Sequence, residues 1–151
     1  MINIFTAEGV AQFTNRINQL TPETKPIWGK MNVAQMLAHV NVSYELHYEP
    51  EKHPKPKGFI KWVLKKFVKT AVVNEVPYKK NMRTSPAFIV SASKNFEKEK
   101  ERLINYLVQT QELGGEHFDG LESHSFGPLT QTEWNNLFSK HLDHHLTQFG
   151  V

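Results

Sequence analysis

The segment from His141 to His145 holds the residues of the chain that are best suited to chemistry. It reads His-Leu-Asp-His-His, so three of the eight histidines fall within about one turn of a predicted helix. His141 and His145 are four residues apart, a spacing that places two side chains next to each other on a helix. Two neutral imidazoles at this spacing can bind one divalent metal ion. The spacing alone supports equally well a pair of structural histidines, hydrogen-bonded to the backbone or stabilised by the helix dipole.

The apolar pattern of the predicted last helix directs this pair toward the core. With Trp134 set at zero on a helical wheel, His141 lies at about −20° and His145 at about +20°, in the middle of the apolar arc. Buried imidazoles need hydrogen-bonding or metal partners, because an unpaired buried polar group costs roughly 1–3 kcal/mol. The opposite, polar side of this helix is expected to carry Asn136, Lys140, Asp143 and Thr147.

Two further residues of the last helix are candidates for a supporting role. His144, at about −80°, is expected at the rim of the site, where it is the alternative to His145 as a ligand. Gln148, at about −40°, faces inward and could orient a ligand or substrate. A hydrogen bond at the end of the helix is the simpler interpretation of Gln148.

A third ligand must come from another helix, and periodicity leaves the choice between two histidines open. His47 lies within the main apolar stripe of the predicted second helix, whereas His39 lies roughly 100° from its centre. His39 belongs to a second row, at 3-4-3 spacing, that a bundle helix touching two neighbours would also bury. The helical wheel slightly favours His47. The second row consists of Met36, His39, Ser43 and Leu46.

Capping residues and apolar periodicity predict the helices that must position these histidines. Residues suited to the N-cap position precede four long apolar repeats, and glycine or proline follows each. Residues 74–92 and 117–129 are expected to be irregular or extended. The expected N-caps are Thr6, Asn32 with Gln35 in a capping box, Ser93, and Thr130 with Glu133 in a capping box. The sequence thus predicts an all-α protein, a four-helix bundle forming one domain over residues 1–151.

Residues 59–73 are expected to form a shorter basic helix between the second and third long helices. Seven lysines and no acidic residue occur between Lys52 and Lys69, interleaved with Trp62 and Phe67. Such a segment can bind an anionic membrane or nucleic acid, or attract an anionic substrate. The favoured interpretation is a solvated lysine face over a packed apolar face. No sequence-reading motif is present, so no specific nucleic-acid partner is expected.

Composition limits the chemistry further. The chain has no cysteine, which excludes disulfides, thiolate metal ligands and a cysteine nucleophile. The net charge is only +3, and no apolar run approaches the roughly 20 residues that span a bilayer. The N-terminal residues do not show a basic stretch followed by an apolar run, so no signal peptide is expected and a cytoplasmic location is expected. No pair of carboxylates has a spacing typical of glycosidases.

Two segments resemble the DinB-like superfamily of four-helix metalloproteins, within a branch of bacterial proteins of unknown function. They are MNVAQMLAHV and the more specific HSFGPLTQTEWNNLFSKHLDHHLTQFG, which also contains His124. The resemblance implies that a histidine of the second helix, His39 in LAH, joins His141 and His145 around one zinc or nickel ion. It thereby selects His39 over His47. His124 is expected to shape a turn, with a place near the mouth of the site as the alternative.

The resemblance also implies a reaction class. Characterised relatives include transferases that use bacillithiol or similar thiols, a mycothiol-dependent isomerase, and metal-dependent hydrolases. The expected function is therefore thiol S-transfer to a small-molecule substrate, with an external low-molecular-weight thiol because the chain has no cysteine. A metal-dependent hydrolase is the first alternative. A non-enzymatic module that binds a partner or an anionic surface through residues 59–73 is the second, and the resemblance suggests a homodimer.

Overall fold

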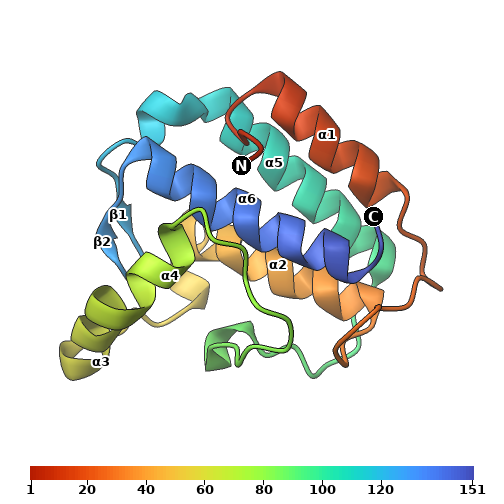
Figure 1. Ribbon diagram of the computed structural model, residues 1–151, viewed down its shortest axis with the longest axis horizontal. Helices are drawn as coiled ribbons and strands as arrows, with labels where there is room; N and C mark the ends of the chain where they lie inside the picture. Colours follow the sequence, from red (N-terminus) through yellow and green to blue (C-terminus); the bar gives the residue numbers. More distant parts are fainter.

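Four long helices form the body of the computed structural model, which describes all 151 residues (Figure 1). They pack side by side as a bundle in which α2 contacts both α5 and α6. The predicted all-α class and the four-helix bundle are confirmed. The long helices are α1 (Ala7–Asn18), α2 (Val33–Tyr48), α5 (Phe96–Phe118) and α6 (Gln131–Gln148).

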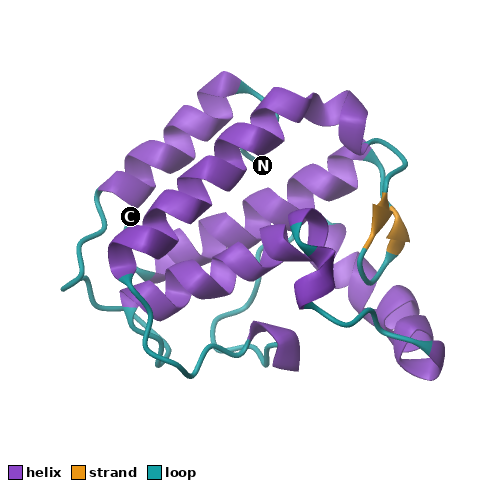
Figure 2. Cartoon of the chain, turned by 180° about the vertical axis from the view of Figure 1, so that it is seen from behind, coloured by secondary structure: helices purple, strands orange, loops and turns teal.

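Short elements connect the long helices. Between α2 and α5 the chain forms a 3₁₀ turn, three consecutive helical segments and a second 3₁₀ turn. Two antiparallel strands form a small hairpin before α6, coloured orange in Figure 2. None of the helices is both long and apolar enough to cross a bilayer. The short elements are η1 (Pro50–Lys52), α3 (Gly58–Val63), η2 (Leu64–Val68), α4 (Lys69–Val73), η3 (Pro86–Phe88), β1 (Glu122–Ser123) and β2 (Gly127–Pro128).

Side-chain caps begin the long helices largely where the sequence predicts. Thr6, Asn32 and Thr130 each accept a hydrogen bond from the first turn of their helix, and the latter two complete capping boxes. The expected cap at Ser93 is wrong, because Asn95 accepts the bond from the Lys98 amide. The expected end at Gly114 is a kink with φ of 73°, after which a last turn continues α5 to Phe118.

Aromatic side chains from three helices form the centre of the core. The Tyr44 ring of α2 stacks on Phe138 of α6 at 4.7 Å and on Tyr106 of α5 at 5.5 Å. Phe118 and Trp134 extend this cluster toward the hairpin end of the bundle. The aromatic core therefore fixes α2, α5 and α6 relative to one another.

The polar side of α6 is not solvated as the helical wheel predicts. Asn136 and Lys140 are only 3% and 2% exposed, because α4 lies over them. Asn136 donates to Val73 O at 2.9 Å, and Lys140 Nζ donates to Ala71 O at 2.9 Å and Asn74 O at 2.6 Å. Burial lowers the pKa of Lys140 to about 8. These two side chains bind the carbonyl groups at the end of α4 and anchor it to the bundle.

The basic segment differs from the predicted amphipathic helix in two respects. It is helical over residues 58–73, but a π-helical turn, η2, interrupts it. Its apolar side is also packed only in part: Phe59, Ile60 and Phe67 remain 74%, 64% and 63% exposed. Figure 1 shows why, since α3 projects away from the four long helices.

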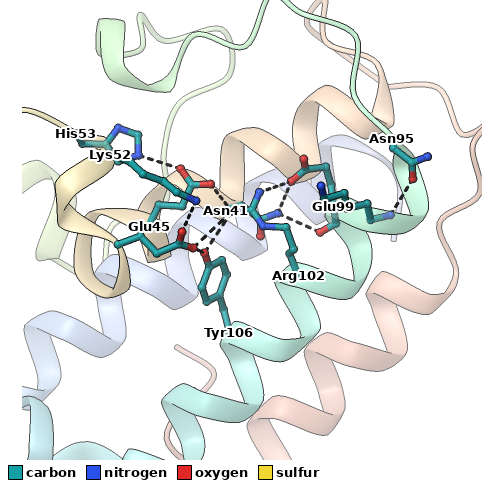
Figure 3. A network of polar contacts seen from close by, with 10 residues as sticks. Asn41, Glu45, Lys52, His53, Asn95, Glu99, Arg102 and Tyr106 are labelled. Atoms are coloured by element: carbon teal, nitrogen blue, oxygen red, sulfur yellow. Dashed lines mark hydrogen bonds and ion pairs between the residues drawn. The ribbon is translucent and has the colours of Figure 1, made fainter.

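A network of charged groups joins α2 to α5 (Figure 3). Arg102 forms ion pairs with Glu45, Glu49 and Glu99, and His53 Nε2 lies 2.9 Å from Glu45 Oε2. Burial disfavours the charged Glu45 carboxylate, but hydrogen bonds from Arg102 and His53 outweigh this and hold the pKa of Glu45 below its ordinary value. The network therefore stabilises the folded state when Glu45 is ionised.

We predict that Glu45→Gln lowers the free energy of unfolding by about 1–3 kcal/mol near pH 7, because Arg102 loses a charged partner. The folded-state pKa of Glu45 lies below its unfolded value, so this stabilisation is complete above about pH 4.5 and is lost as the pH falls through the folded-state pKa. Urea unfolding over a series of pH values from 7 downward should show the two proteins converging as the pH falls below about 4.5. Glu23→Gln, an exposed residue without an ion pair, is the control; an equal loss in that variant would contradict the prediction.

Candidate metal centre

Three histidines from two helices meet inside the bundle. His39 comes from the middle of α2, and His141 and His145 come from adjacent turns of α6. One ring nitrogen of each lies within 4.8 Å of the others, and His39 Nε2 lies 3.0 Å from His141 Nε2. The three ring centroids are 4.5–5.0 Å apart. The tertiary structure thus brings together the three histidines that the resemblance selects.

Each of these rings is hydrogen-bonded through its other nitrogen. His39 Nδ1 donates to Phe88 O at 2.8 Å, which requires a protonated Nδ1 because a carbonyl oxygen only accepts. His145 Nδ1 lies 2.7 Å from Gln148 Oε1, and His141 Nδ1 lies 2.7 Å from Ser43 Oγ. The Nε2 atoms of His39 and His145 are consequently left with lone pairs.

Gln148 is itself fixed by the loop that precedes α2. Its Nε2 donates to Trp28 O at 2.7 Å, so its Oε1 is the atom that faces His145. Gly29, with φ of +89°, follows directly, and a Cβ atom there would lie 2.5 Å from Gln148 Nε2. Only glycine suits this position, because the left-handed backbone and the close side chain both exclude a Cβ atom.

The contact between His39 and His141 determines which ring nitrogen of His141 carries the proton. Because His39 Nε2 carries none, His141 Nε2 must donate in the 3.0 Å contact, and its Nδ1 must accept from the Ser43 hydroxyl. Ser43 can also accept, so His141 can take the other tautomer and expose its Nε2 lone pair without losing this partner. The surroundings are therefore compatible with three Nε2 donors on one ion.

Burial keeps all three imidazoles neutral near pH 7. His39 and His145 are 4% and 7% exposed. Desolvation lowers the pKa of His145 to about 3, assisted by His39, and lowers that of His39 despite the hydrogen bond to Phe88. Desolvation, with repulsion from the other two rings, also holds the pKa of His141 well below its ordinary value. Neutral imidazole is the form that binds divalent metal ions.

The donor set fits a divalent ion. Nitrogen atoms bound to zinc at about 2.0–2.1 Å in tetrahedral geometry lie roughly 3.3 Å apart. The 3.0 Å separation of His39 Nε2 and His141 Nε2 is close to this value, and all three donor atoms lie within 4.8 Å of one another. Three imidazoles suit zinc, nickel, copper or iron. The hydrogen bonds to Phe88, Gln148 and Ser43 are of the kind that orient metal-binding histidines.

The other histidines considered from the sequence lie outside this cluster. His47, which periodicity slightly favours, packs against Phe118 at 5.0 Å and Trp134 at 5.3 Å between ring centroids. Burial, followed by repulsion from His117, lowers the pKa of His47 to about 4. His47 therefore belongs to the aromatic core, because the hairpin end of the bundle covers that part of α2.

His144 and His124 have different surroundings. His144 borders the cluster, 5.0 Å from the His145 ring, and contacts Trp28 and Tyr78 at 5.9 and 5.7 Å between centroids. His124 lies in the turn between β1 and β2, where its Nε2 donates to His53 O at 3.1 Å. His144 thus occupies the rim, and His124 shapes the hairpin.

Sequence reasoning missed two of the three groups that hold the rings. Helical spacing places Ser43 in the same predicted row as His39, four residues later, but this spacing by itself assigns it no role in orienting a histidine. The Phe88 carbonyl comes from η3, inside a segment predicted only as irregular, and no side-chain pattern marks it.

Comparison with known proteins identifies the family. Residues 5–150 match the family described as "Protein of unknown function (DUF1569)". This match spans nearly the whole chain, so the protein belongs to the DUF1569 family. No curated protein and no solved structure matches the chain.

We predict that metal-free protein near pH 7 holds each ring in one tautomer. Long-range ¹H–¹⁵N spectra should show Nδ1 protonated in His39 and His145, and Nε2 protonated in His141. In Gln148→Leu, which removes the acceptor, His145 should populate both tautomers while His39 stays unchanged. A protonated Nε2 in His39 of the wild type would contradict the hydrogen-bond assignment.

Proposed function

We propose that this member of the DUF1569 family is a metal-dependent enzyme whose metal ion is held by His39, His141 and His145. One observation carries the proposal: one ring nitrogen of each neutral imidazole lies within 4.8 Å of the others, while each Nδ1 atom has its own partner. Structural histidines need partners for their ring nitrogens, but they do not require three rings from two helices to converge on one point.

The unbalanced hydrogen bonding of the cluster supports an ion over a purely structural role. Among the three Nε2 atoms only one contact is a hydrogen bond, between His141 and His39, and His145 Nε2 has no partner. A divalent ion would engage all three nitrogens at once.

The resemblance to DinB-like proteins supports zinc or nickel as the ion. Three protein ligands leave a coordination position for substrate, the arrangement typical of catalytic sites. A divalent ion supplies Lewis acidity there, which favours the ionised form of a bound thiol or water near pH 7.

We further propose thiol S-transfer as the reaction. Because the chain contains no cysteine, the sulfur must come from an external low-molecular-weight thiol. The thiol sulfur forms a bond to an electrophilic carbon of the second substrate, the leaving group departs with its bonding electrons, and the thiol proton passes to solvent. Metal-dependent hydrolysis is the alternative, since the same donor set serves water equally well.

Aromatic side chains around the cluster support a small-molecule site. The Phe88 ring lies 5.4 Å from His39 and 5.6 Å from His141 between centroids. Trp28 and Tyr78 flank His144 at the rim, and Lys80 Nζ lies 4.4 Å from the Trp28 ring centroid. In this proposal, Phe88 restricts water, and Lys80 favours an anionic substrate.

We predict that metal-stripped protein takes up about one equivalent of zinc or nickel per chain. His141→Ala and His145→Ala should each lose this uptake, because only two imidazoles remain. Calorimetric titration with each metal, followed by elemental analysis of desalted protein, measures the stoichiometry.

Two histidine variants serve as matched controls for metal uptake. His144→Gln changes the neighbour of His145, and His47→Gln changes the other histidine of α2; both should retain about one equivalent. Equal loss in His144→Gln and His145→Gln would overturn the ligand assignment. Absence of uptake by folded wild-type protein would overturn the metal centre itself.

We predict that the metal-loaded protein accelerates conjugation of a low-molecular-weight thiol, such as glutathione, cysteine or bacillithiol, to an electrophile such as monochlorobimane. The rate should fall to the uncatalysed level in metal-stripped protein and in His141→Ala. Fluorescence of the conjugate reports the reaction.

Omission of the thiol separates the two reaction classes. If the metal-loaded protein releases product from ester or amide substrates without a thiol, its reaction is hydrolysis and the proposal of thiol transfer is wrong. Thiol conjugation that is equal with and without metal would contradict the proposed role of the ion.

A further inference from the structure

The segments α3 and η2, residues 58–68, form an exposed basic arm that the metal centre does not use. Figure 1 shows α3 at the edge of the molecule, extending beyond the bundle and the hairpin. Phe59, Ile60, Trp62 and Phe67 are 74%, 64%, 49% and 63% exposed. Residues of this size are normally exposed singly, so four on one short arm indicate a binding surface.

The exposed side chains form one aromatic cluster. Phe59 stacks on Trp62 with ring centroids 5.6 Å apart, and Trp62 meets Phe67 edge-on at 5.8 Å. Lys66 Nζ lies 5.0 Å from the Trp62 centroid and 5.7 Å from that of Phe67. The arm thus presents aromatic rings and a cation at the same point.

Contact with the rest of the protein uses a different side of the arm. Val63, Leu64 and Val68 are half-buried, and Lys65 packs over the backbone of Gly127 in the hairpin. Lys140 and Asn136 anchor the following helix, α4. The exposed cluster is therefore held in place by the fold and is not needed to attach the arm.

All charged side chains of the arm and of the loop that precedes it are positive. Seven lysines and no acid occur between Lys52 and Lys69. Ion pairs with Glu49, Glu122 and Glu133 engage three of them, Lys52, Lys61 and Lys69. Lys55, Lys57, Lys65 and Lys66 form no ion pair, and Lys66 lies against the aromatic cluster.

From these observations we propose that the basic arm docks the protein on the surface of an anionic phospholipid bilayer. Phe59, Trp62 and Phe67 enter the interfacial region of the bilayer, where amphipathic aromatic rings are favoured. The unpaired lysines contact anionic headgroups, and each is expected to raise the partition coefficient about fivefold. This inference does not depend on the metal centre.

The bilayer accounts for every exposed side chain of the arm, and the two other occupants account for only some of them. Nucleic acid would use the lysines through its phosphates and could stack bases on the aromatic rings, but it would leave the aliphatic Ile60 without a partner in a stack. A second copy joined through the same surface would cover the aromatic rings but place lysines of one arm against those of the other. Charge and exposed apolar area together therefore select the membrane.

Co-sedimentation of the full-length protein with vesicles tests the proposal. Binding is expected to vesicles of equal parts phosphatidylglycerol and phosphatidylcholine, and none to phosphatidylcholine alone. Lys57→Gln/Lys66→Gln should lower the partition coefficient roughly 25-fold, and Phe59→Ser/Phe67→Ser at least about tenfold. Circular dichroism checks that each variant is folded.

Lys94→Gln/Lys98→Gln is the matched control, because it removes the same charge from exposed, unpaired lysines. Lys98 lies in the first turn of α5 and Lys94 two residues before this helix. Figure 1 shows the start of α5 on the other side of the bundle from α3. This variant should bind vesicles within about twofold of the wild type. An equal loss in the control would overturn the arm as the docking site.

Quenching of tryptophan fluorescence by lipids brominated in the acyl chain tests insertion. The wild type should be quenched, whereas Trp62→Phe should still sediment with vesicles but lose most of the quenching. Absence of vesicle binding by the wild type at low ionic strength overturns the proposal. So does binding to duplex DNA without vesicle binding, or a dimer that Phe59→Ser/Phe67→Ser dissociates without vesicle binding.

A folded His141→Ala variant separates this inference from the proposed function. It should lose metal uptake but bind vesicles like the wild type. Loss of vesicle binding in that variant would contradict an independent docking surface.

Discussion

The candidate site depends on three hydrogen bonds to the outer nitrogens of His39, His141 and His145. Their partners are a backbone carbonyl, a hydroxyl and a side-chain amide. Without these partners a buried imidazole could rotate or carry its proton on either nitrogen, and the inner nitrogens would have no defined role. With them, the rings are oriented before any ligand arrives, so little conformational freedom remains to be lost on binding.

Those partners explain why distant parts of the chain are needed. Phe88 lies in the irregular connection between α4 and α5, and Gln148 is fixed by the loop before α2, through Trp28 and the backbone of Gly29. The aromatic core around Tyr44 holds α2 and α6 at the distance that the rings require. The loops and the aromatic core therefore both position the three histidine rings, and the helices alone would not complete the site.

The lysine side chains of this protein have two contrasting environments. Lys140 is buried, and its ammonium group donates hydrogen bonds to the carbonyl groups at the end of α4. The lysines of the basic arm remain in solvent beside exposed aromatic rings. The first arrangement fixes the base of the segment that carries the second. Lysine side chains thus stabilise the fold at one site and form a charged surface at another.

Local patterns were sufficient for much of the architecture. Capping residues and apolar periodicity predicted four long helices, with Thr6, Asn32 and Thr130 at their starts, because these signals act within one or two turns. The i, i+4 spacing of His141 and His145 likewise placed both on one side of α6. Tertiary packing decided the rest. Whether His39 or His47 joined the pair depended on which neighbour covered each side of α2, and the solvated side predicted for Lys140 was covered by α4. The carbonyl of Phe88 has no sequence signal, since every residue carries one and only the fold determines where it points.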